Sequence, residues 1–425
     1  MICWLRLDLR LADNPALLAA AERGAPVIPV YVWSPEDESP WAAGGASRWW
    51  LHQSLAALDA SLRDRGSRLI VRQGDAAHEL LSVARAVGAE YVTWARRYEP
   101  IVAAGDDKIE AALVKAGLGV MRTEGNLLFE PEHVRTQAGQ PFQVFTPFWK
   151  ACLALPAVAP AHPAPRTIRA PVQWPRSLAI ADLALEPTVD WTGGLASTWK
   201  PGEIGARAAL KTFMREAMGE YREGRNQPAQ RGTSGLSPHL HFGEISPRQV
   251  WHAVRDAMYG PAGAKKLTHG AETGAQEFLR QLGWREFAHH LLHHFPNTPE
   301  RPLRETFAKF PWRRDAKALR AWQRGVTGYP IVDAGMRELW HTGWMHNRVR
   351  MVVGSFLVKH LLIPWQEGAE WFWDTLVDAD LANNTLGWQW IAGCGADAAP
   401  YFRIFNPVLQ GEKFDTDGEI GRAHV

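Results

Sequence analysis

The chain has 425 residues, of which 46% are hydrophobic, and this is enough for two or three domains with their own cores. A formal net charge of +2 excludes a protein that is basic throughout, and three scattered cysteines exclude a disulfide framework or a cysteine-based zinc site. No apolar run is long enough to span a membrane, and charges at Arg6, Asp8 and Arg10 break the pattern of a signal peptide, so we expect a cytoplasmic protein.

The first 130 residues alternate between short apolar runs and amphipathic stretches. We predict strands at residues 1–7, 27–33, 68–72, 91–94 and 119–122. Amphipathic helices are predicted between them, among others at residues 16–23 and 47–65. This alternation indicates an α/β domain over residues 1–130, with a parallel sheet covered on both faces. No G-x-G-x-x-G motif follows the first strand, so the pattern does not indicate a dinucleotide-binding domain.

Alanine and proline dominate residues 151 to 200, which predicts a stiff surface connector over residues 131–202. From residue 203 to 425 the periodicity predicts only helices, at residues 204–222, 246–258, 275–294, 316–324, 329–341, 346–362 and 367–376. The expected fold is therefore α/β plus all-α. More than half of the 21 tryptophans lie in the helical domain, where they either form a plain aromatic core or stack flat ligands and pass electrons.

The end of the chain is unusual in composition. Residues 419–425 read EIGRAHV, which is the translation of a common sequencing-adapter oligonucleotide. We therefore expect that this tail is not native and that the helical domain over residues 203–425 is truncated at its C-terminus.

Two segments of the helical domain carry residues suited to ligand binding. Gly232 to Ser237 combine glycines with small hydroxyl residues just before a predicted helix, which suits phosphate oxygens, although an ordinary capped loop has the same composition. Asn347, Arg350 and Met351 share one helix face at positions i, i+3 and i+4. An amide, a guanidinium and a thioether are poor core residues together, so this face predicts a binding site, unless its arginine only pairs with nearby acids.

Acidic residues and histidines supply further candidates. Asp378 and Asp380 can accept a ring N–H or a ribose hydroxyl, pair with Arg350 or Arg285, or cap a helix. Histidines recur with i, i+4 spacing at positions 289, 290, 293 and 294. Zinc uses such a face, but a third ligand at a clear spacing is missing, so we predict no metal site.

Seven motifs, in this order, carry a resemblance to a known family: WLRLDLRLADNPAL at 4–17, GTSGLSPHLHFGEISPRQ at 232–249, WREF at 284–287, GYPIVDAGMREL at 328–339, TGWMHNRVRM at 342–351, DADLANN at 378–384 and GWQWIAGCGADAAPYFRIFNP at 387–407. Over nearly its whole length the chain resembles DNA photolyases and cryptochromes, in particular class I-type or closely related bacterial enzymes for cyclobutane pyrimidine dimers. The resemblance implies an N-terminal antenna domain, a long connector and a C-terminal helical domain that holds FAD folded into a U.

The resemblance also implies which residues contact FAD. Those around the phosphates and ribose would be Tyr221, Thr233, Ser234, Gly235, Leu236 and Ser237, with Arg285 also facing the cofactor. Beside the isoalloxazine would lie Arg350 paired with Asp378, then Ala379 and Asp380. Asn384 would face N5, where a neutral amide can hydrogen-bond in several redox states. Cryptochromes commonly carry a different residue at this place, which favours repair.

Three tryptophans match the family's electron-transfer chain: Trp388, Trp365 and Trp312. They lie too far apart along the chain for one helix to align them. A row of easily oxidised indoles would let an excited, oxidised flavin draw electrons from the surface. Three ordinary core tryptophans remain the alternative.

On the DNA side, Arg225 and Arg348 match contacts to phosphate, for which a planar guanidinium is suited. A dimer extruded from the duplex would meet the residues Gln281, Trp284, Asn347, Met351, Trp390 and Gln410. Enzymes for cyclobutane dimers usually have Glu where this chain has Gln281. Those for six-four photoproducts often have Gln there, but they typically carry a histidine pair in place of Asn347 and Arg348.

The expected activity is that of a deoxyribodipyrimidine photo-lyase, a carbon–carbon lyase acting on UV-damaged DNA. Reduced FAD, excited by blue or near-ultraviolet light, would give an electron to the flipped dimer, and the electron would return after the cyclobutane ring splits. The alternatives are a cryptochrome-like photoreceptor, a six-four photolyase and a non-catalytic flavin-binding remnant. We expect a monomer.

A second, antenna chromophore is expected in the α/β domain. The Asn-Glu pair that holds folate in one branch of the family has no clear equivalent after Tyr98, Glu99 and Pro100. Methenyltetrahydrofolate is favoured over a deazaflavin, and an empty pocket is the third alternative.

Overall fold

The computed structural model describes residues 1–260, 269–399 and 404–420. Its sheet consists of the strands β1 (Ile2–Trp4), β2 (Ile28–Trp33), β3 (Ile70–Gln73), β4 (Tyr91–Ala95) and β5 (Gly119–Thr123). They are all parallel, in the order β3-β2-β1-β4-β5. This confirms the parallel sheet predicted for the first part of the chain.

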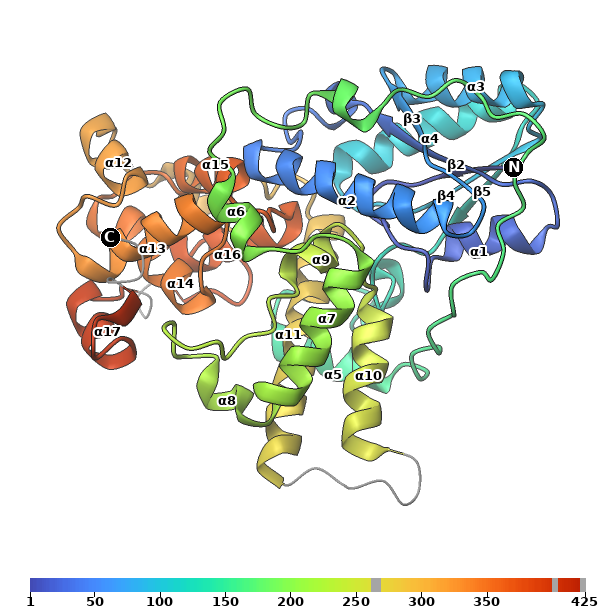
Figure 1. Ribbon diagram of the computed structural model, residues 1–425. Helices are drawn as coiled ribbons and strands as arrows, with labels where there is room; N and C mark the ends of the chain where they lie inside the picture. Colours follow the sequence, from blue (N-terminus) through green and yellow to red (C-terminus); the bar gives the residue numbers. More distant parts are fainter. Residues whose placement is uncertain (261–268, 400–403, 421–425) are drawn as a thin grey trace.

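Helices cover both faces of this sheet (Figure 1). They are α1 (Pro15–Glu22) and α2 (Gly45–Arg63) on one face, and α3 (Ala76–Val87) and α4 (Pro100–Lys115) on the other. Because side chains alternate along a strand, Cys3 and Tyr31 pack toward α1 and α2, whereas Ile2 and Val30 pack toward α3 and α4. The strands are buried on both faces, which explains why they read as continuous apolar runs.

The connector runs along the α/β domain. Val27 N donates to the carbonyl oxygen of Arg169 at 2.9 Å, and Leu178 N donates to that of Val71 at 3.0 Å. Its elements are α5 (Phe145–Ala154), η3 (Ile180–Leu183) and α6 (Gly193–Thr198). Of these, α5 packs against the long helix α11 and so belongs spatially to the helical half.

The described part of the chain beyond residue 200 contains helices and no strands. The α-helices are α7 (Glu203–Glu216), α8 (Tyr221–Gly224), α9 (Ser237–His241), α10 (Pro247–Tyr259), α11 (His269–His294), α12 (Ala316–Gln323), α13 (Pro330–Thr342), α14 (Asn347–Ser355), α15 (Trp365–Thr375), α16 (Leu381–Ala392) and α17 (Pro407–Phe414). Short 3-10 or π turns add η4 (Met218–Glu220), η5 (Glu305–Lys309) and η6 (Phe356–His360), whereas η1 (Pro35–Glu38) and η2 (Pro131–His133) lie before this half. This confirms the all-helical second half.

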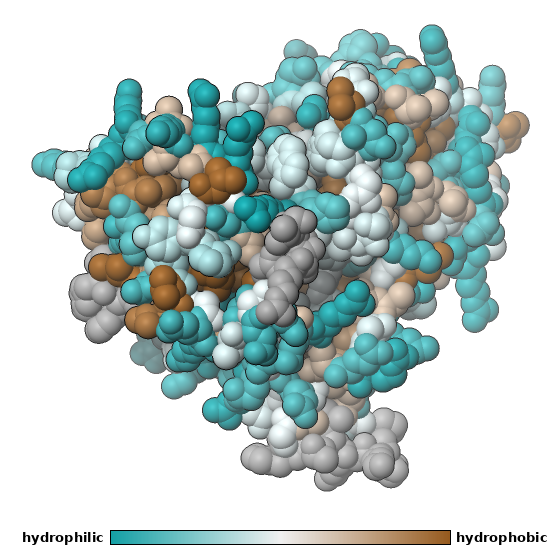
Figure 2. Space-filling view, turned by 60° about the vertical axis from the view of Figure 1, so that its left-hand side comes forward, coloured by the Kyte–Doolittle hydropathy of each residue, from teal (hydrophilic) through white to brown (hydrophobic). Residues whose placement is uncertain are grey.

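One core of this half lies among α12, α13, α14, α15 and α16, where Trp322, Trp365 and Trp388 are buried, and a second lies among α7, α10 and α11. The surface of this half is not uniformly polar. Figure 2 shows hydrophobic side chains in patches among hydrophilic ones, and large exposed apolar residues of this half include Trp340 and Leu409.

Two helices predicted as continuous are interrupted. The prediction at 204–222 divides into α7, η4 and α8 because α11 packs closely on η4: a Cβ atom at Gly274 would lie 2.2 Å from the carbonyl oxygen of Met218. The prediction at 346–362 ends as α14 at Ser355 and continues as the π turn η6, in which Leu361 N donates to the carbonyl oxygen of Phe356 at 3.1 Å.

The periodicity missed α5, α16 and α17. In α16 the buried residues, among them Leu381, Thr385 and Trp388, lie on one half of the helix. The other half carries Leu386, Gly387 and Trp390 beside two asparagines, so the two faces differ little in polarity and the sequence lacks the contrast that marks an amphipathic helix. The motif residues 400–403 and the tail residues 421–425 lie outside the described part.

Candidate functional site

An ion pair joins α14 to the segment that precedes α16. Arg350 Nη2 lies 2.9 Å from Asp378 Oδ2 and 3.0 Å from Asp378 Oδ1, while Arg350 Nε donates to the carbonyl oxygen of Met345 at 2.7 Å. The Asp378 side chain is buried, and that of Arg350 is 24% exposed. Because an unpaired charge is costly in an apolar interior, each member depends on the other. The pair places a fixed, charged feature inside the helical half.

Asp380 has two sets of partners. Its Oδ1 accepts from Asn383 N at 2.9 Å and caps α16, while its Oδ2 lies 3.4 Å from His241 Nδ1 and 3.5 Å from His289 Nε2. Burial raises the pKa of Asp380, but the two histidines outweigh burial and hold that pKa well below its usual range. The carboxylate lines a cavity of about 40 Å³ between the α/β domain and the helical half.

The loop before α9 lies against the end of α8. A Cβ atom at Gly232 would lie 2.4 Å from the carbonyl oxygen of Gly224, so only glycine permits this approach. The hydroxyl groups of Thr233 and Ser237 have no hydrogen-bond partner among the described residues. They are therefore free to bind the phosphate or sugar oxygens of a ligand.

The rest of this loop is internally organised. Ser234 Oγ accepts from Leu236 N at 3.3 Å, and Gly235 has a φ of +63°, the left-handed region that favours glycine. Tyr221 begins α8 and is buried, and burial raises the pKa of its hydroxyl to about 12. Its hydroxyl group thus keeps its proton at neutral pH and can donate to a ligand.

Asn384 is oriented by a neighbouring helix. Its Nδ2 donates to the carbonyl oxygen of Ala369 on α15 at 3.0 Å, which leaves Oδ1 as the free end of the amide. Ala379, between the two aspartates, is buried. An oriented amide, the Arg350–Asp378 pair and the free loop hydroxyls are the donors and acceptors that a polar ring, a polyol and phosphates require. The residues present therefore fit FAD.

Arg285 on α11 faces the α/β domain. Its Nη1 donates to the carbonyl oxygen of Asn126 at 2.8 Å and lies 3.5 Å from Glu286 Oε1. Arg285 also lines the small cavity beside Asp380. It thus links the helical half to the segment that follows β5.

The three tryptophans of the expected electron-transfer chain meet in one hydrophobic cluster. Trp388 and Trp365 are buried, each 2% exposed, whereas Trp312 is half-buried. Trp388 packs edge-on to Trp322 with ring centroids 6.2 Å apart. The cluster thus runs from a buried indole on α16 to one that solvent reaches.

Of the residues expected to face a DNA lesion, all but Gln410 lie on α11, α14 and α16. Trp284 stacks on Phe145 with centroids 3.8 Å apart and planes 7° apart, so one face of its indole is already covered. Gln281 Nε2 donates to the carbonyl oxygen of its own helix at Glu277, at 3.2 Å. Asn347 Nδ2 lies 3.9 Å from Met351 Sδ on the same face of α14. Since α11 and α14 both pack against α16, which carries Trp390, these residues belong to one neighbourhood.

The expected phosphate contacts are held by different partners. Arg225 Nη1 lies 3.6 Å from Glu277 Oε2, and the guanidinium of Arg348 lies over the ring of Phe414. Gln410 is half-buried on α17, which packs on α13. The sequence pattern gave no indication of Phe414, since its role depends on a contact between α17 and α14.

A much larger cavity, of about 710 Å³, lies at the carboxyl ends of the strands. Ligands of doubly wound sheets bind at this edge. Its aromatic lining is Trp4, Tyr31, Trp33, Trp41, Phe242 and Trp373. Its carboxylates are Glu36, Asp37, Glu38, Asp75, Glu99, Asp106 and Glu300, which outnumber the cations Arg6, Arg97 and Lys108.

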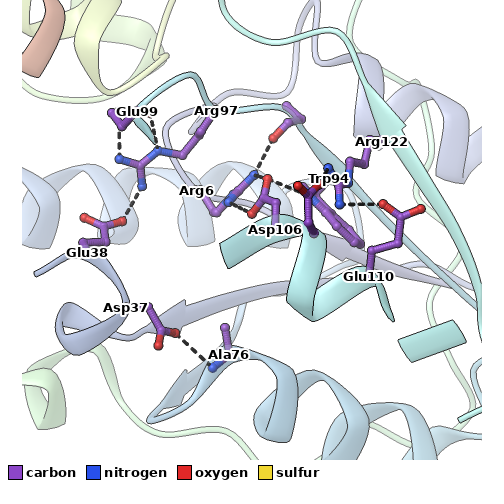
Figure 3. A network of polar contacts seen from close by, with 12 residues as sticks. Arg6, Asp37, Glu38, Ala76, Trp94, Arg97, Glu99, Asp106, Glu110 and Arg122 are labelled. Carbon is purple, nitrogen blue, oxygen red and sulfur yellow. Dashed lines mark hydrogen bonds and ion pairs between the residues drawn. The ribbon is translucent and has the colours of Figure 1, made fainter. Parts of the chain in front are cut away.

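Two of those cations are neutralised within the wall (Figure 3). Arg6 Nη1 lies 2.7 Å from Asp106 Oδ1, and Arg97 pairs with both Glu38 and Glu99. The cavity is therefore lined by flat aromatic rings and carries a net negative charge. The sequence analysis expected an antenna chromophore in the α/β domain but did not predict the residues of this cavity. Each predicted strand is followed within a few residues by a charged residue, and this signal could have marked the carboxyl edge of the sheet.

The described residues offer neither a metal cluster nor a membrane helix. No group of three or more His, Cys, Asp or Glu residues there could hold a metal ion, and no helix there is long and apolar enough to cross a bilayer. Three of the spaced histidines have protein partners: His289 faces Asp380, His290 Nε2 accepts from Phe142 N at 3.0 Å, and His294 Nε2 lies 3.1 Å from the carbonyl oxygen of Pro131.

Comparison with known proteins identifies both halves. A family model described as DNA photolyase matches residues 1–167, and one described as the FAD binding domain of DNA photolyase matches residues 278–425. The deoxyribodipyrimidine photo-lyase of Agrobacterium fabrum is 50% identical over 427 residues, which cover 100% of this chain and 86% of that protein. The chain belongs to the DNA photolyase family. This confirms the resemblance and the FAD-binding domain.

The photolyase family includes repair enzymes and cryptochromes. Cryptochrome-1 of Arabidopsis thaliana is 42% identical over 99% of this chain and 62% of that protein. The crystal structure of a bacterial class III photolyase from Agrobacterium tumefaciens superposes with a TM-score of 0.93 at 48% identity, covering 100% of this chain and 86% of that one. An archaeal photolyase from Sulfolobus tokodaii with two FAD molecules gives 0.83 at 30% identity, covering 100% and 89%. Membership in the photolyase family therefore does not decide between repair and photoreception. The residues of the site have to decide between them.

Proposed function

We propose that this chain is a light-driven DNA repair enzyme that splits cyclobutane pyrimidine dimers with FAD. The observation that carries the proposal is the arrangement of α14. Arg350, which pairs with Asp378 and is expected to contact the cofactor, lies about one turn after Asn347 and directly before Met351, the two residues of α14 expected to contact the lesion. One helical turn rises about 5.4 Å, so a cofactor and a lesion bound to these residues would be in contact.

Different residues of the chain would bind the cofactor and the substrate. Bound FAD would supply the photoexcited electron that opens the cyclobutane ring. Arg350, Asp378 and Asn384 would orient its ring system, and Thr233 and Ser237 would bind its phosphates and sugar through their hydroxyl groups. The cluster with Trp388 at its buried end would re-reduce the cofactor when it is oxidised.

On the substrate side, Trp284, which stacks on Phe145 through one face, would meet the extruded dimer with the other face of its indole. Gln281 commits its Nε2 to Glu277, which leaves its oxygen as an acceptor. We propose that the enzyme acts as a cytoplasmic monomer on damaged duplex DNA, with Arg225 and Arg348 at the phosphates.

The test compares three substrates under blue light with reduced, FAD-loaded protein: an oligonucleotide with a cyclobutane dimer, one with a six-four photoproduct and an undamaged control. We expect the first to be restored and the second to persist. Repair of the six-four lesion alone would assign that substrate, which Gln281 permits. Bound FAD without light-dependent repair of either lesion would overturn the proposal in favour of a cryptochrome-like photoreceptor.

We also propose that the cavity of about 710 Å³ holds a methenyltetrahydrofolate antenna rather than a deazaflavin. Its flat aromatic walls suit a pterin, and its excess of carboxylates suits the cationic methenyl bridge. Reconstitution followed by absorbance and chromatography of the released chromophore tests this. Release of a deazaflavin, or of a second equivalent of FAD, would contradict it.

A further inference from the structure

Arg348 is held by neutral groups from two distant segments. Its guanidinium carbon lies 4.5 Å from the ring centroid of Phe414, the last residue of α17. Its Nη2 donates to Asn226 Oδ1, just beyond α8. A stacked, hydrogen-bonded guanidinium has lost most of its rotational freedom, so its direction is set before any ligand arrives.

Asn226 is itself locked in place. Its backbone N donates to the carbonyl oxygen of Glu223 at 3.0 Å, and its Nδ2 donates to that of Arg222 at 3.3 Å. The amide nitrogen is thereby turned back to α8, and its oxygen is turned toward Arg348. A neutral acceptor in this orientation holds the arginine without cancelling its charge.

The charge of Arg348 has no counter-ion in the described part of the chain. No carboxylate there lies within ion-pair distance of it, whereas Arg225 has Glu277. Burial and the nearby cation of Arg225 both lower the pKa of Arg348. Its Nε is also buried without an acceptor. Lys413 Nζ also lies 5.3 Å from the centroid of the same Phe414 ring. Cations clustered in this way favour the binding of a polyanion.

We propose that Phe414 and Asn226 are positioning residues that hold Arg348 ready for a backbone phosphate of DNA, so that α17 takes part in DNA binding through this aromatic ring. The proposal rests on the DNA repair function proposed above. It predicts that the contact serves damaged and undamaged DNA alike, because phosphates carry no sequence information.

The test measures affinity for dimer-containing and undamaged duplexes over a series of salt concentrations, with flavin absorbance and thermal unfolding as folding controls. Asn226→Asp places a carboxylate beside Arg348 with almost no change in shape. We expect it to weaken both affinities about tenfold and to reduce the salt dependence by about one phosphate contact. Phe414→Leu should weaken both affinities by a similar factor, and Phe414→Tyr, which keeps the aromatic face, should restore them.

Two comparisons make the inference falsifiable. Val408→Ala changes an exposed residue of the same helix and should bind DNA as the parent does. In an Arg348→Ala background, Phe414→Leu should cause no further loss. Parental affinity and salt dependence in both Asn226→Asp and Phe414→Leu, while the parent repairs dimers, would overturn the positioning role alone. A parent that neither binds nor repairs damaged DNA would instead overturn the function on which it rests.

Discussion

At the scale of single residues, Arg350 and Asp378 compensate each other's charge inside the helical half. The carboxylate is buried and the guanidinium is only partly exposed. Removing one partner of a buried pair leaves the other uncompensated, at a typical cost of about 3–5 kcal/mol. We expect Arg350→Gln to lower the free energy of unfolding toward the lower end of that range, because Arg350 is not fully buried, and to reduce bound flavin.

Chemical denaturation and the ratio of flavin to protein absorbance measure both effects. The double variant Arg350→Gln with Asp378→Asn has no unpaired charge and should recover most of the lost stability but not the flavin content. A single variant with the same free energy of unfolding and the same flavin content as the parent would show that the pair is dispensable.

At the scale of elements, the contact between α15 and α16 depends on a missing side chain. A Cβ atom at Gly368 would lie 2.1 Å from Cη2 of Trp388, so α15 can approach this indole only with glycine there. Gly368→Ala should displace Trp388 and destabilise the protein by about 1–3 kcal/mol, the usual range for overpacking. Flavin photoreduction should slow with it, as followed by absorbance during illumination.

Gly387 on α16 provides the matched control. Nothing lies within 4 Å of a Cβ atom built there. Gly387→Ala should raise stability by about 0.5–1 kcal/mol through helix propensity and leave photoreduction unchanged. Equal photoreduction rates in the two alanine variants would show that Trp388 is not part of the electron path.

At the scale of the whole molecule, Glu286 joins the helical half to the α/β domain. Its Oε2 accepts from Leu128 N at 2.8 Å and from Phe129 N at 3.1 Å, in the segment after β5. Burial raises the pKa of Glu286 to about 7, in spite of Arg285 and these N–H groups, which lower it. Below its ordinary pKa the carboxyl is protonated in both the folded and the unfolded chain.

As the pH rises from about 4.5 to about 7, the unfolded chain loses the Glu286 proton before the folded chain does, so this residue makes stability fall and then level off. Glu286→Gln is neutral and still accepts from both N–H groups. Its advantage over the parent in urea denaturation should therefore be absent near the acid end and grow up to about pH 7. A constant difference across this range would contradict a raised pKa.

The sequence by itself determined the order of strands and helices in the first half, the all-helical second half and, through its long motifs, the family resemblance. Apolar periodicity and long local motifs carry that information, because both follow from contacts near in the chain. Only the tertiary structure decided that α11 packs closely on Met218 at Gly274, that a net acidic cavity opens at the strand ends, and that Phe414 lies under Arg348. Those features depend on which surfaces meet across long stretches of chain, and no local pattern records such a meeting.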